Sequence, residues 1–356
     1  MKKRLIAYHL PQFHQIKEND IWWGEGYTEW TAIRRWKPCF SGHIIRKPGT
    51  LGYYNLLESE VLEKQYQLAK SHGIEGFCFW SYWFGDGERL LEKPLEHLLL
   101  PTSQVQYCLA WANHSWWDKS TWRLLKEQKY LGLEDYKKFY KTMQPHFKNP
   151  NYIKKGNKLV FSIFMPQDIQ DFDVFYKVWN DLAKQDGFDG FYFIGDQISE
   201  KLKYKNLFDA FMHSPGIFSK RSIIQKIIDK LIRYYFWKFF GPIRYSYPKM
   251  MKNIYQKFSK VDNFVPTIIA GWDSTPRHEK RGILFTDFNP ENFRVHINEI
   301  FDFNIKNEFI FIKSWNEWAE GNTLEPDDIF GDALLLIIKE ANAQGVSPMS
   351  KSQSIL

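Results

Sequence analysis

Two glutamates near the C-terminal end of the chain, Glu317 and Glu320, have the residue type and spacing of a catalytic pair. They follow the apolar run Phe309–Ile312, which predicts a buried strand. Because only two residues separate them, both carboxyl groups can face the same side of a helical turn or a tight loop. Cleavage of a glycosidic bond needs such a pair, since one carboxyl group protonates the leaving oxygen while another group acts at or near the anomeric carbon. The structural alternative is a helix N-terminus, whose dipole favours acids.

Aromatic and polar side chains near this and other predicted strand ends are candidate substrate-binding residues. The chain is 18% aromatic and contains 15 tryptophans, and aromatic rings pack on the C–H faces of sugars as well as in protein cores. Trp315, Asn316 and Trp318 flank the glutamates, which favours a catalytic interpretation of the pair. The candidates that wall a sugar cleft, or simply cap the protein, are Trp22, Trp23, Glu29, Trp30, Trp80, Tyr82, Trp111, Asn113, His114, Trp272, Asp273, Arg277, Trp315, Asn316 and Glu325.

Four of these candidates carry groups with more specific chemistry. Asp273 can bind sugar hydroxyls and Arg277 can hold a carboxylate or a phosphate, although a structural salt bridge explains them equally well. Asn113 can donate hydrogen bonds to a substrate. His114 can also carry a proton near neutral pH.

Composition argues against several other classes of protein. The three cysteines are too few and too scattered for a disulfide framework or a zinc site, and the histidines have no ligand spacing. Asp327-Asp328 resembles the metal motif of a nucleotide-sugar transferase, but adjacent acids are common in loops, so we expect no metal and no cofactor. No apolar run approaches the roughly 18 residues of a membrane span, and the N-terminal run Leu5–Tyr8 is too short for a signal peptide. These features predict a cytoplasmic, reduced protein.

Eight apolar runs separated by helical stretches predict a single (β/α)8 barrel, a TIM-type α/β fold. We expect the chemistry at the carboxyl ends of the strands, where the polar and aromatic clusters occur. A doubly wound sheet is the competing architecture, but no glycine-rich phosphate loop follows the first strand. The expected strands are 4–10, 74–80, 106–111, 158–164, 191–194, 208–212, 265–270 and 309–313, and the expected helices are 58–71, 172–186, 290–301 and 332–341. The barrel is expected to span 1–342, followed by a disordered tail at 343–356.

A basic, aromatic helical insertion is predicted at 217–250. Residues 201–260 contain 14 Lys/Arg and two acids, a local charge of 14 − 2 = +12, so the rest of the +7 chain carries −5. A nucleic-acid-binding protein usually spreads its basic residues over its binding face, so we expect no nucleic-acid partner. From Arg221 to Phe240, isoleucines fall on one side of a helix and Lys226, Lys230 and Arg233 on the other. The helix either docks on an anionic membrane at the inner face or packs its apolar side on the barrel.

Several motifs together resemble the WbsX-type proteins, which are related to glycoside hydrolase family 99 and occur in O-antigen and capsular polysaccharide loci. The resemblance extends from about Ala7 to Gly331. The motifs are Tyr8–His14, Asn19-Asp20, Trp22–Gly24, Gly26–Trp30, Gly73–Phe77, Trp111–Asn113, Gly271–Arg277, Trp315–Gly321 and Leu324–Asp327. The chain departs from the pattern at His114-Ser115, where an acid often follows Trp-Ala-Asn, and in its longer basic segment.

The resemblance implies a (β/α)8 barrel and a two-glutamate mechanism. In family 99 endo-α-mannosidases, the glutamate matching Glu317 deprotonates the sugar's own 2-hydroxyl, which attacks C1 to form a 1,2-anhydro sugar. The glutamate matching Glu320 protonates the leaving oxygen and later activates the acceptor. Such a path needs O2 and the leaving group to be trans, as in α-mannosides or α-rhamnosides, and gives net retention.

The sequence therefore predicts a retaining, metal-independent carbohydrate-active enzyme of O-antigen, capsular or lipopolysaccharide biosynthesis. Its partner is expected to be an oligo- or polysaccharide, with a lipid-linked form among the options. Hydrolysis and glycosyl transfer both remain open, because they differ only in whether water or a glycan hydroxyl is the acceptor. The alternative from a different class is a non-catalytic glycan-binding or scaffolding protein of a polysaccharide assembly complex.

Overall fold

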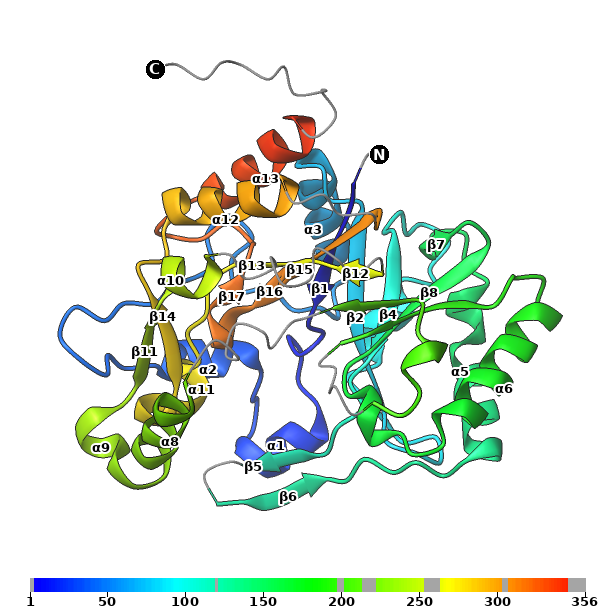
Figure 1. Ribbon diagram of the computed structural model, residues 1–356, viewed down its shortest axis with the longest axis horizontal. Coiled ribbons are helices and arrows are strands. Elements are labelled where there is room, and N and C mark those ends of the chain that lie inside the picture. The colour runs from blue at the N-terminus through cyan, green and yellow to red at the C-terminus, as the bar shows by residue number, and fades with distance from the viewer. Residues whose placement is uncertain are drawn as a thin grey trace.

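Eight parallel strands form the centre of the molecule in the computed structural model, which describes residues 3–118, 121–196, 202–212, 222–252, 263–302 and 307–344 (Figure 1). All eight lie where the apolar runs predict them. They are β1 (Arg4–His9), β2 (Gly76–Trp83), β4 (Tyr107–Trp111), β8 (Lys158–Ile163), β9 (Phe191–Gly195), β10 (Ala210–Met212), a seventh strand in two pieces, β12 (Phe264–Val265) and β13 (Thr267–Ile269), and β15 (Phe309–Lys313).

The sheet closes into a barrel through Pro266, which divides the seventh strand. The sheet order is β12-β10-β9-β8-β4-β2-β1-β15-β13, so its two ends are halves of one chain segment. The half before Pro266 pairs with β10 and the half after it pairs with β15. Proline has no N–H to donate, but its carbonyl accepts a hydrogen bond from the Phe311 N–H at 3.0 Å. The predicted (β/α)8 barrel is confirmed.

Helices cover the outside of the barrel (Figure 1). They are α3 (Ser59–Ser71), α4 (Lys93–His97), α5 (Leu133–Phe147), α6 (Phe172–Gln185), α12 (Pro290–Asp302) and α13 (Ala333–Gln344). The sequence analysis omitted α5, which buries Tyr136, Tyr140 and Met143 and packs against Trp179 of α6. Helix α13 includes residues 343 and 344 of the expected tail, and 345–356 lie outside the described residues. Within the described ranges, no helix is both long and apolar enough to cross a membrane.

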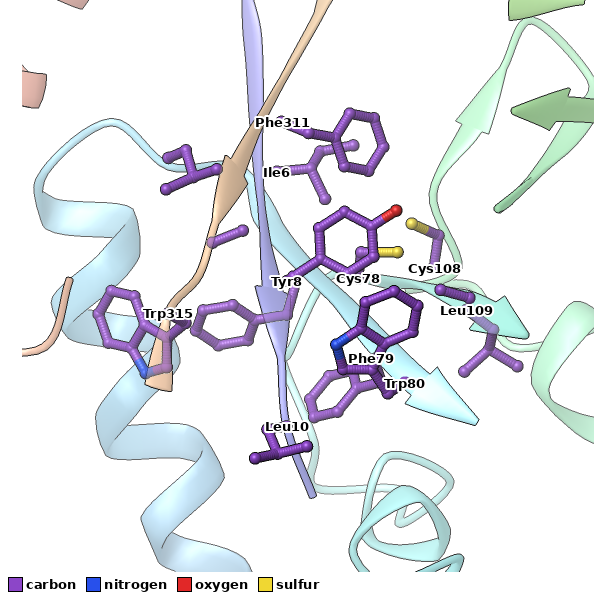
Figure 2. Close-up of a cluster of buried hydrophobic side chains, with 14 of the residues drawn as sticks. Ile6, Tyr8, Leu10, Cys78, Phe79, Trp80, Cys108, Leu109, Phe311 and Trp315 are labelled. Carbon is purple, nitrogen blue, oxygen red and sulfur yellow. The ribbon is translucent and has the colours of Figure 1, made fainter. Parts of the chain in front are cut away.

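The barrel interior is filled by side chains rather than open (Figure 2). The Tyr8 ring lies 4.5 Å from the Trp80 ring and 5.6 Å from the Phe311 ring, measured between centroids. The Tyr8 hydroxyl makes a hydrogen bond of 2.8 Å with the hydroxyl of Ser162, so the one polar group of this ring is satisfied. Burial raises the pKa of Tyr8 well above its ordinary value, so the ring stays neutral.

The loops at the carboxyl ends of the strands carry most of the irregular structure. In Figure 1 they lie toward the bottom, where β1 and β2 point. Their elements are α1 (Lys17–Trp23) and α2 (Glu29–Arg35) after β1; β5 (Trp116–Asp118) and β6 (Arg123–Lys126) after β4; α11 (Thr275–His278), η5 (Glu279–Arg281) and β14 (Ile283–Thr286) after β13; and β16 (Asn316–Glu317), η6 (Trp318–Glu320) and β17 (Asn322–Thr323) after β15. Further short pieces are β3 (Arg89–Leu90) after β2, η1 (Pro166–Asp168) after β8, β7 (Lys154–Lys155) before β8 and η2 (Lys205–Leu207) before β10.

The predicted basic insertion is helical, but its apolar side does not pack on the barrel. It consists of α8 (Ile223–Leu231), η3 (Ile232–Phe236), α9 (Trp237–Phe240), β11 (Ile243–Ser246) and α10 (Tyr247–Met251), with 217–221 outside the described residues. Strand β11 pairs in parallel with β14, which attaches the insertion to the barrel. Packing of the apolar side on the barrel is wrong, because Ile223, Ile224 and Ile227 are exposed while Asp229 is buried.

Gly76 at the start of β2 tests how tightly the barrel strands are packed. A Cβ at this position would lie 2.2 Å from the Gln106 carbonyl oxygen of the neighbouring chain segment. We expect Gly76→Ala to lower the free energy of unfolding by about 3 kcal/mol or more, the upper range for overpacking. Gly187→Ala is the control, since Gly187 has open space around it and a φ of +89°. Urea unfolding should show a loss of only about 1 kcal/mol for the control. Equal losses would contradict the steric argument.

Candidate active site

The chain turns sharply after β15, and the turn presents Glu317 and Glu320. The Trp315 N–H donates to the Tyr8 carbonyl at 2.7 Å, and β16 then pairs with β17 in a narrow hairpin. Gly321 closes the turn at a φ of +58°, where an added Cβ would lie 2.7 Å from the Asp273 nitrogen. Between residues 315 and 320, only the two glutamates are partly exposed. The predicted pair therefore reaches the surface from one turn.

Arg277 connects Glu320 to a second acid from a distant loop. Its Nη1 donates to Glu320 Oε1 at 2.6 Å, and its Nη2 donates to both carboxylate oxygens of Glu29 at 2.8 and 3.0 Å. Glu29 is buried and also accepts the Ala319 N–H at 3.0 Å. Burial raises the pKa of Glu29, while the Arg277 charge opposes that rise. These ion pairs position η6, and they place Glu29 and Arg277 beside Glu320, in contact with protein groups.

Glu317 has a different environment from Glu320. Its Oε1 accepts a hydrogen bond from the Trp80 indole N–H at 3.1 Å. Burial, followed by the negative charge of Glu320, raises the pKa of Glu317 to about 7, although Arg277 and Lys313 act in the opposite direction. A carboxyl group with a pKa near neutrality is matched to proton transfer at the pH of most cells. The pair therefore combines one carboxyl group that titrates near pH 7 with one that is ion-paired.

Several aromatic candidates do line the region around the glutamates. Trp80 contacts Glu317 directly, and burial together with the Glu317 charge raises the pKa of Tyr82. Trp116 packs edge-on against Tyr82 and Trp22, at centroid distances of 5.1 and 5.7 Å. These rings come from β2, β5 and α1, so they extend the site along the strand ends.

Two further candidates lie at the edge of this region. The His114 ring lies 5.2 Å from Phe164, which in turn contacts Trp80 at 5.4 Å. Trp23 is partly exposed and packs near Tyr27, at a centroid distance of 6.0 Å. The described ring contacts of both residues are with neighbouring aromatic side chains.

Three predicted binding tryptophans lie in the core instead. Trp111 packs against Phe139 of α5 and Phe175 of α6, on the helix side of the barrel wall. Trp30 donates its indole N–H to the Tyr54 carbonyl at 2.7 Å, and Trp315 is fully buried beside Phe77 within the cluster of Figure 2. A strand end exposes alternate residues to opposite sides, so proximity in sequence did not distinguish core from site.

The two candidate asparagines hold loops in place. Asn316 is fully buried, accepts the Leu10 N–H at 2.7 Å and donates to the Leu10 carbonyl at 3.1 Å. Asn113 is also fully buried, and its amide exchanges two hydrogen bonds of 2.8 Å with the backbone of Met165. Because these amides are occupied by the chain, both residues position the site rather than face a substrate.

Glu325 is likewise enclosed by protein groups. Its carboxylate accepts hydrogen bonds from Trp318 Nε1 at 2.6 Å, Gln65 Nε2 at 2.7 Å and the Tyr54 hydroxyl at 3.0 Å. Burial raises its pKa to about 7, and these three donors work against the rise. Glu325 therefore anchors the segment that follows the turn carrying Glu317 and Glu320.

Asp273 and Trp272 lie beside the site in the loop after β13. Asp273 Oδ2 contacts His43 Nε2 at 2.8 Å, and its Oδ1 accepts the Thr275 N–H at 2.9 Å, at the start of the helix that carries Arg277. The Asp273 N–H donates to the Glu320 carbonyl at 2.6 Å. Trp272 is partly buried against the core. Asp273 thus fixes the relative positions of Arg277 and Glu320.

A buried ion pair next to the site was not predicted from the sequence. Lys313, the last residue of β15, is paired with Asp196, and its ammonium group lies 5.5 Å from the centre of the Trp80 ring. The sequence contains two signals of this ion pair. One is a lysine inside an otherwise apolar strand, and the other is an acid directly after β9. His43, Arg46, Tyr54 and Gln65, which hold the site loops, lie in stretches with no such signal.

In the part of the chain that the structure describes, no cluster of three or more metal-ligand side chains is present. The Asp327-Asp328 sequence has another role: Asp327 is buried, pairs with Arg46 at 3.2 Å and accepts two backbone N–H groups.

Comparison with known proteins identifies the family. The model of the family described as glycosyltransferase WbsX matches residues 5–338. The chain belongs to the glycosyltransferase WbsX family. This confirms the WbsX-type resemblance.

Among curated relatives, the uncharacterized protein WxcX from two strains of Xanthomonas campestris pv. campestris is 30% identical over 351 residues. The match covers 95% of this chain and 49% of WxcX, so the chain spans about half the length of these curated relatives.

Solved structures support the fold of this WbsX-family chain. The endo-α-mannosidase of glycoside hydrolase family 99 from Bacteroides thetaiotaomicron aligns with a TM-score of 0.57 at 14% identity, covering 96% of this chain and 97% of that one. A glycoside hydrolase-like protein aligns with a TM-score of 0.59 at 16% identity, covering 96% and 94%. These alignments confirm the prediction of a family 99-like barrel fold.

The raised pKa of Glu317 predicts a pH-dependent cost in stability. Its proton is held more tightly in the folded protein, where the pKa is about 7, than at the ordinary value of 4.5. Wild type should therefore lose stability as the pH rises between these values. Glu317→Gln does not titrate, so at about pH 8 it should be more stable than wild type by up to about 3 kcal/mol, and the gain should vanish toward about pH 5.

Urea unfolding at both pH values measures this difference, with Glu340→Gln on the exposed surface of α13 as the control. The control should follow the wild-type pH dependence. A gain for Glu317→Gln that stays constant with pH would contradict the prediction.

Proposed function

We propose that this protein is a retaining carbohydrate-active enzyme that uses Glu317 and Glu320 on a glycosidic bond in polysaccharide biosynthesis. The observation that carries the proposal is the pair of partly exposed carboxyl groups on one turn, with different electrostatic environments. The fold and the WbsX family support a carbohydrate substrate. The site lies at the carboxyl ends of the barrel strands, where TIM-type barrels carry their chemistry.

In the first step, Glu317 takes the proton of the sugar 2-hydroxyl while O2 attacks C1. The bond from C1 to the leaving oxygen breaks, and Glu320 donates its proton to that oxygen. The product is a 1,2-anhydro sugar. This step needs O2 and the leaving group on opposite faces, so we propose α-mannosides or α-rhamnosides as the substrate class.

In the second step, Glu320 takes a proton from the acceptor, whose oxygen attacks C1. The bond between C1 and O2 breaks, and Glu317 returns its proton to O2. Two inversions at C1 give net retention. Water as acceptor gives hydrolysis, and a glycan hydroxyl gives transfer.

The environment of Glu317 supports its role as the base, and Glu320 has to be released from Arg277 to act as the acid. The pKa of Glu317, about 7, makes it a stronger base than an ordinary glutamate while leaving it ionised above neutrality. Arg277 holds Glu320 with one nitrogen and Glu29 with the other. We propose that Arg277 keeps its bonds to Glu29 when Glu320 is protonated, so that the turn stays in place through both steps.

Replacing either glutamate tests the reaction. We expect Glu317→Gln and Glu320→Gln each to lower kcat/KM by roughly 100-fold or more on a cleavable α-mannoside or α-rhamnoside, because each removes a proton carrier. Glu127→Gln, an exposed acid at the same end of the barrel, should retain wild-type turnover. Mass spectrometry separates hydrolysis from transfer, and NMR of the first-formed anomer reports retention. Wild-type turnover in both variants would contradict the proposal and would favour a non-catalytic glycan-binding protein.

The pH profile tests which glutamate is the base. With an aryl leaving group that needs no protonation, kcat/KM should rise with pH through an apparent pKa of about 7 as Glu317 loses its proton. The residual activity of Glu317→Gln should lack this limb. A wild-type profile with this substrate that shows no rising limb near neutrality would contradict Glu317 as the base.

A further inference from the structure

The insertion between β10 and β12 exposes the side of its helices that amphipathic helices normally bury. On α8 the exposed fractions of Ile223, Ile224 and Ile227 are 77%, 70% and 55%. Tyr235, Phe239 and Phe240 continue this surface at 73%, 81% and 66%. We call the exposed apolar surface of 223–240 the apolar face. Soluble proteins rarely leave so many large apolar side chains together in water, and such patches mark docking sites.

One polar residue of α8, Asp229, is turned toward the protein and holds the helix in this orientation. Asp229 is buried and accepts a hydrogen bond from the Tyr245 hydroxyl of β11. At the other end, the Arg281 guanidinium stacks over the Trp237 ring at 4.6 Å, and Lys280 donates to the Lys238 carbonyl at 3.2 Å. These contacts on the opposite side of the helix therefore keep the apolar face exposed to solvent.

The apolar face continues across to the hairpin β5–β6. The rings of Tyr234 and Trp122 are stacked, with centroids 5.9 Å apart and an interplanar angle of 10°. Trp122 is 58% exposed, and Trp117 and Leu124 of the same hairpin are also exposed. In Figure 1 the insertion and this hairpin lie at the end of the molecule toward which β1 and β2 point, the end that carries Glu317 and Glu320.

Basic residues surround the apolar face. The described residues 222–252 contain seven Lys/Arg and one acid, the buried Asp229, which gives 7 − 1 = +6. Lys226, Lys230 and Lys238 are exposed beside the isoleucines and aromatic rings. Exposed lysines beside apolar and aromatic side chains are typical of helices that lie in the interface of an anionic membrane.

We propose that this face docks the protein on an anionic phospholipid membrane, with the strand-end site beside the lipid surface. The positive charge of the face favours the membrane over a second copy of the chain as the binding partner. Residues 223–240 contain four Lys/Arg and Asp229, a charge of 4 − 1 = +3, so pairing two copies through this face would bring like charges together, whereas anionic headgroups complement the charge. Isoleucine and phenylalanine side chains can enter the acyl boundary while the lysine stems extend to the headgroups. The proposal does not depend on the reaction assigned to the site.

Vesicle flotation tests the proposal with the full chain. We expect binding to phosphatidylcholine vesicles that contain phosphatidylglycerol, and little binding to phosphatidylcholine alone. Each of Lys226→Gln and Lys230→Gln should weaken the partition coefficient roughly fivefold. Ile227→Glu should weaken it roughly tenfold or more, because an apolar side chain no longer enters the lipid.

Val295→Glu is the matched control, since Val295 is 58% exposed on α12 at the opposite end of the molecule and Ile227 is 55% exposed. Circular dichroism confirms that both variants fold, and the control should bind vesicles as wild type does. No binding to anionic vesicles, or equal weakening by Val295→Glu, overturns the proposal. A dimer that Ile227→Glu dissociates, without vesicle binding, would show that a second copy covers the face and would also overturn it.

Discussion

The arrangement of the candidate active site depends on one arginine that is shared between two acids. Arg277 from α11 contacts Glu29 from α2 and Glu320 from η6, so three loops that are far apart in sequence meet at one guanidinium. A guanidinium suits this task because its planar donors address two carboxylates in fixed directions. Glu29 is 1% exposed, so removing the arginine would leave a buried carboxylate without its cation. The network is therefore a structural requirement as well as part of the site.

The same network leaves Glu317 as the member of the glutamate pair that titrates near neutrality. Glu317 has a single described hydrogen bond, from Trp80, whereas Glu320 has a charged partner. The ammonium group of Lys313 lies near the Trp80 ring, and its positive charge opposes the rise that burial causes in the pKa of Glu317. An environment that costs stability in this way is common at functional sites, where groups are held in protonation states that water would not favour.

The basic insertion shows that an amphipathic pattern does not by itself say which side is buried. The isoleucines of α8 predict a core-facing stripe by periodicity, yet the single acid of the described insertion, Asp229, faces the protein. Tyr245 on β11 provides its partner, and β11 is placed by its pairing with β14. The orientation of the helix is thus a consequence of a strand pairing between residues 243–246 and 283–286.

The sequence by itself determined the eight strands, their order as a barrel and the two carboxyl groups of the pair. Strands buried on both faces, such as Phe309–Ile312, are continuous apolar runs, and the turn after them carries Glu317 and Glu320 within three positions. The apolar runs and the spacing of the two glutamates can each be recognised within a short stretch of sequence.

Only the tertiary structure decided which of the neighbouring polar and aromatic residues face the site. Trp80 contacts Glu317 whereas Trp111, also on a strand, packs against the outer helices, and Asn316 is occupied by Leu10 although it is adjacent to Glu317. Their directions depend on the twist and stagger of strands and on partners hundreds of residues away, which no short stretch of sequence records.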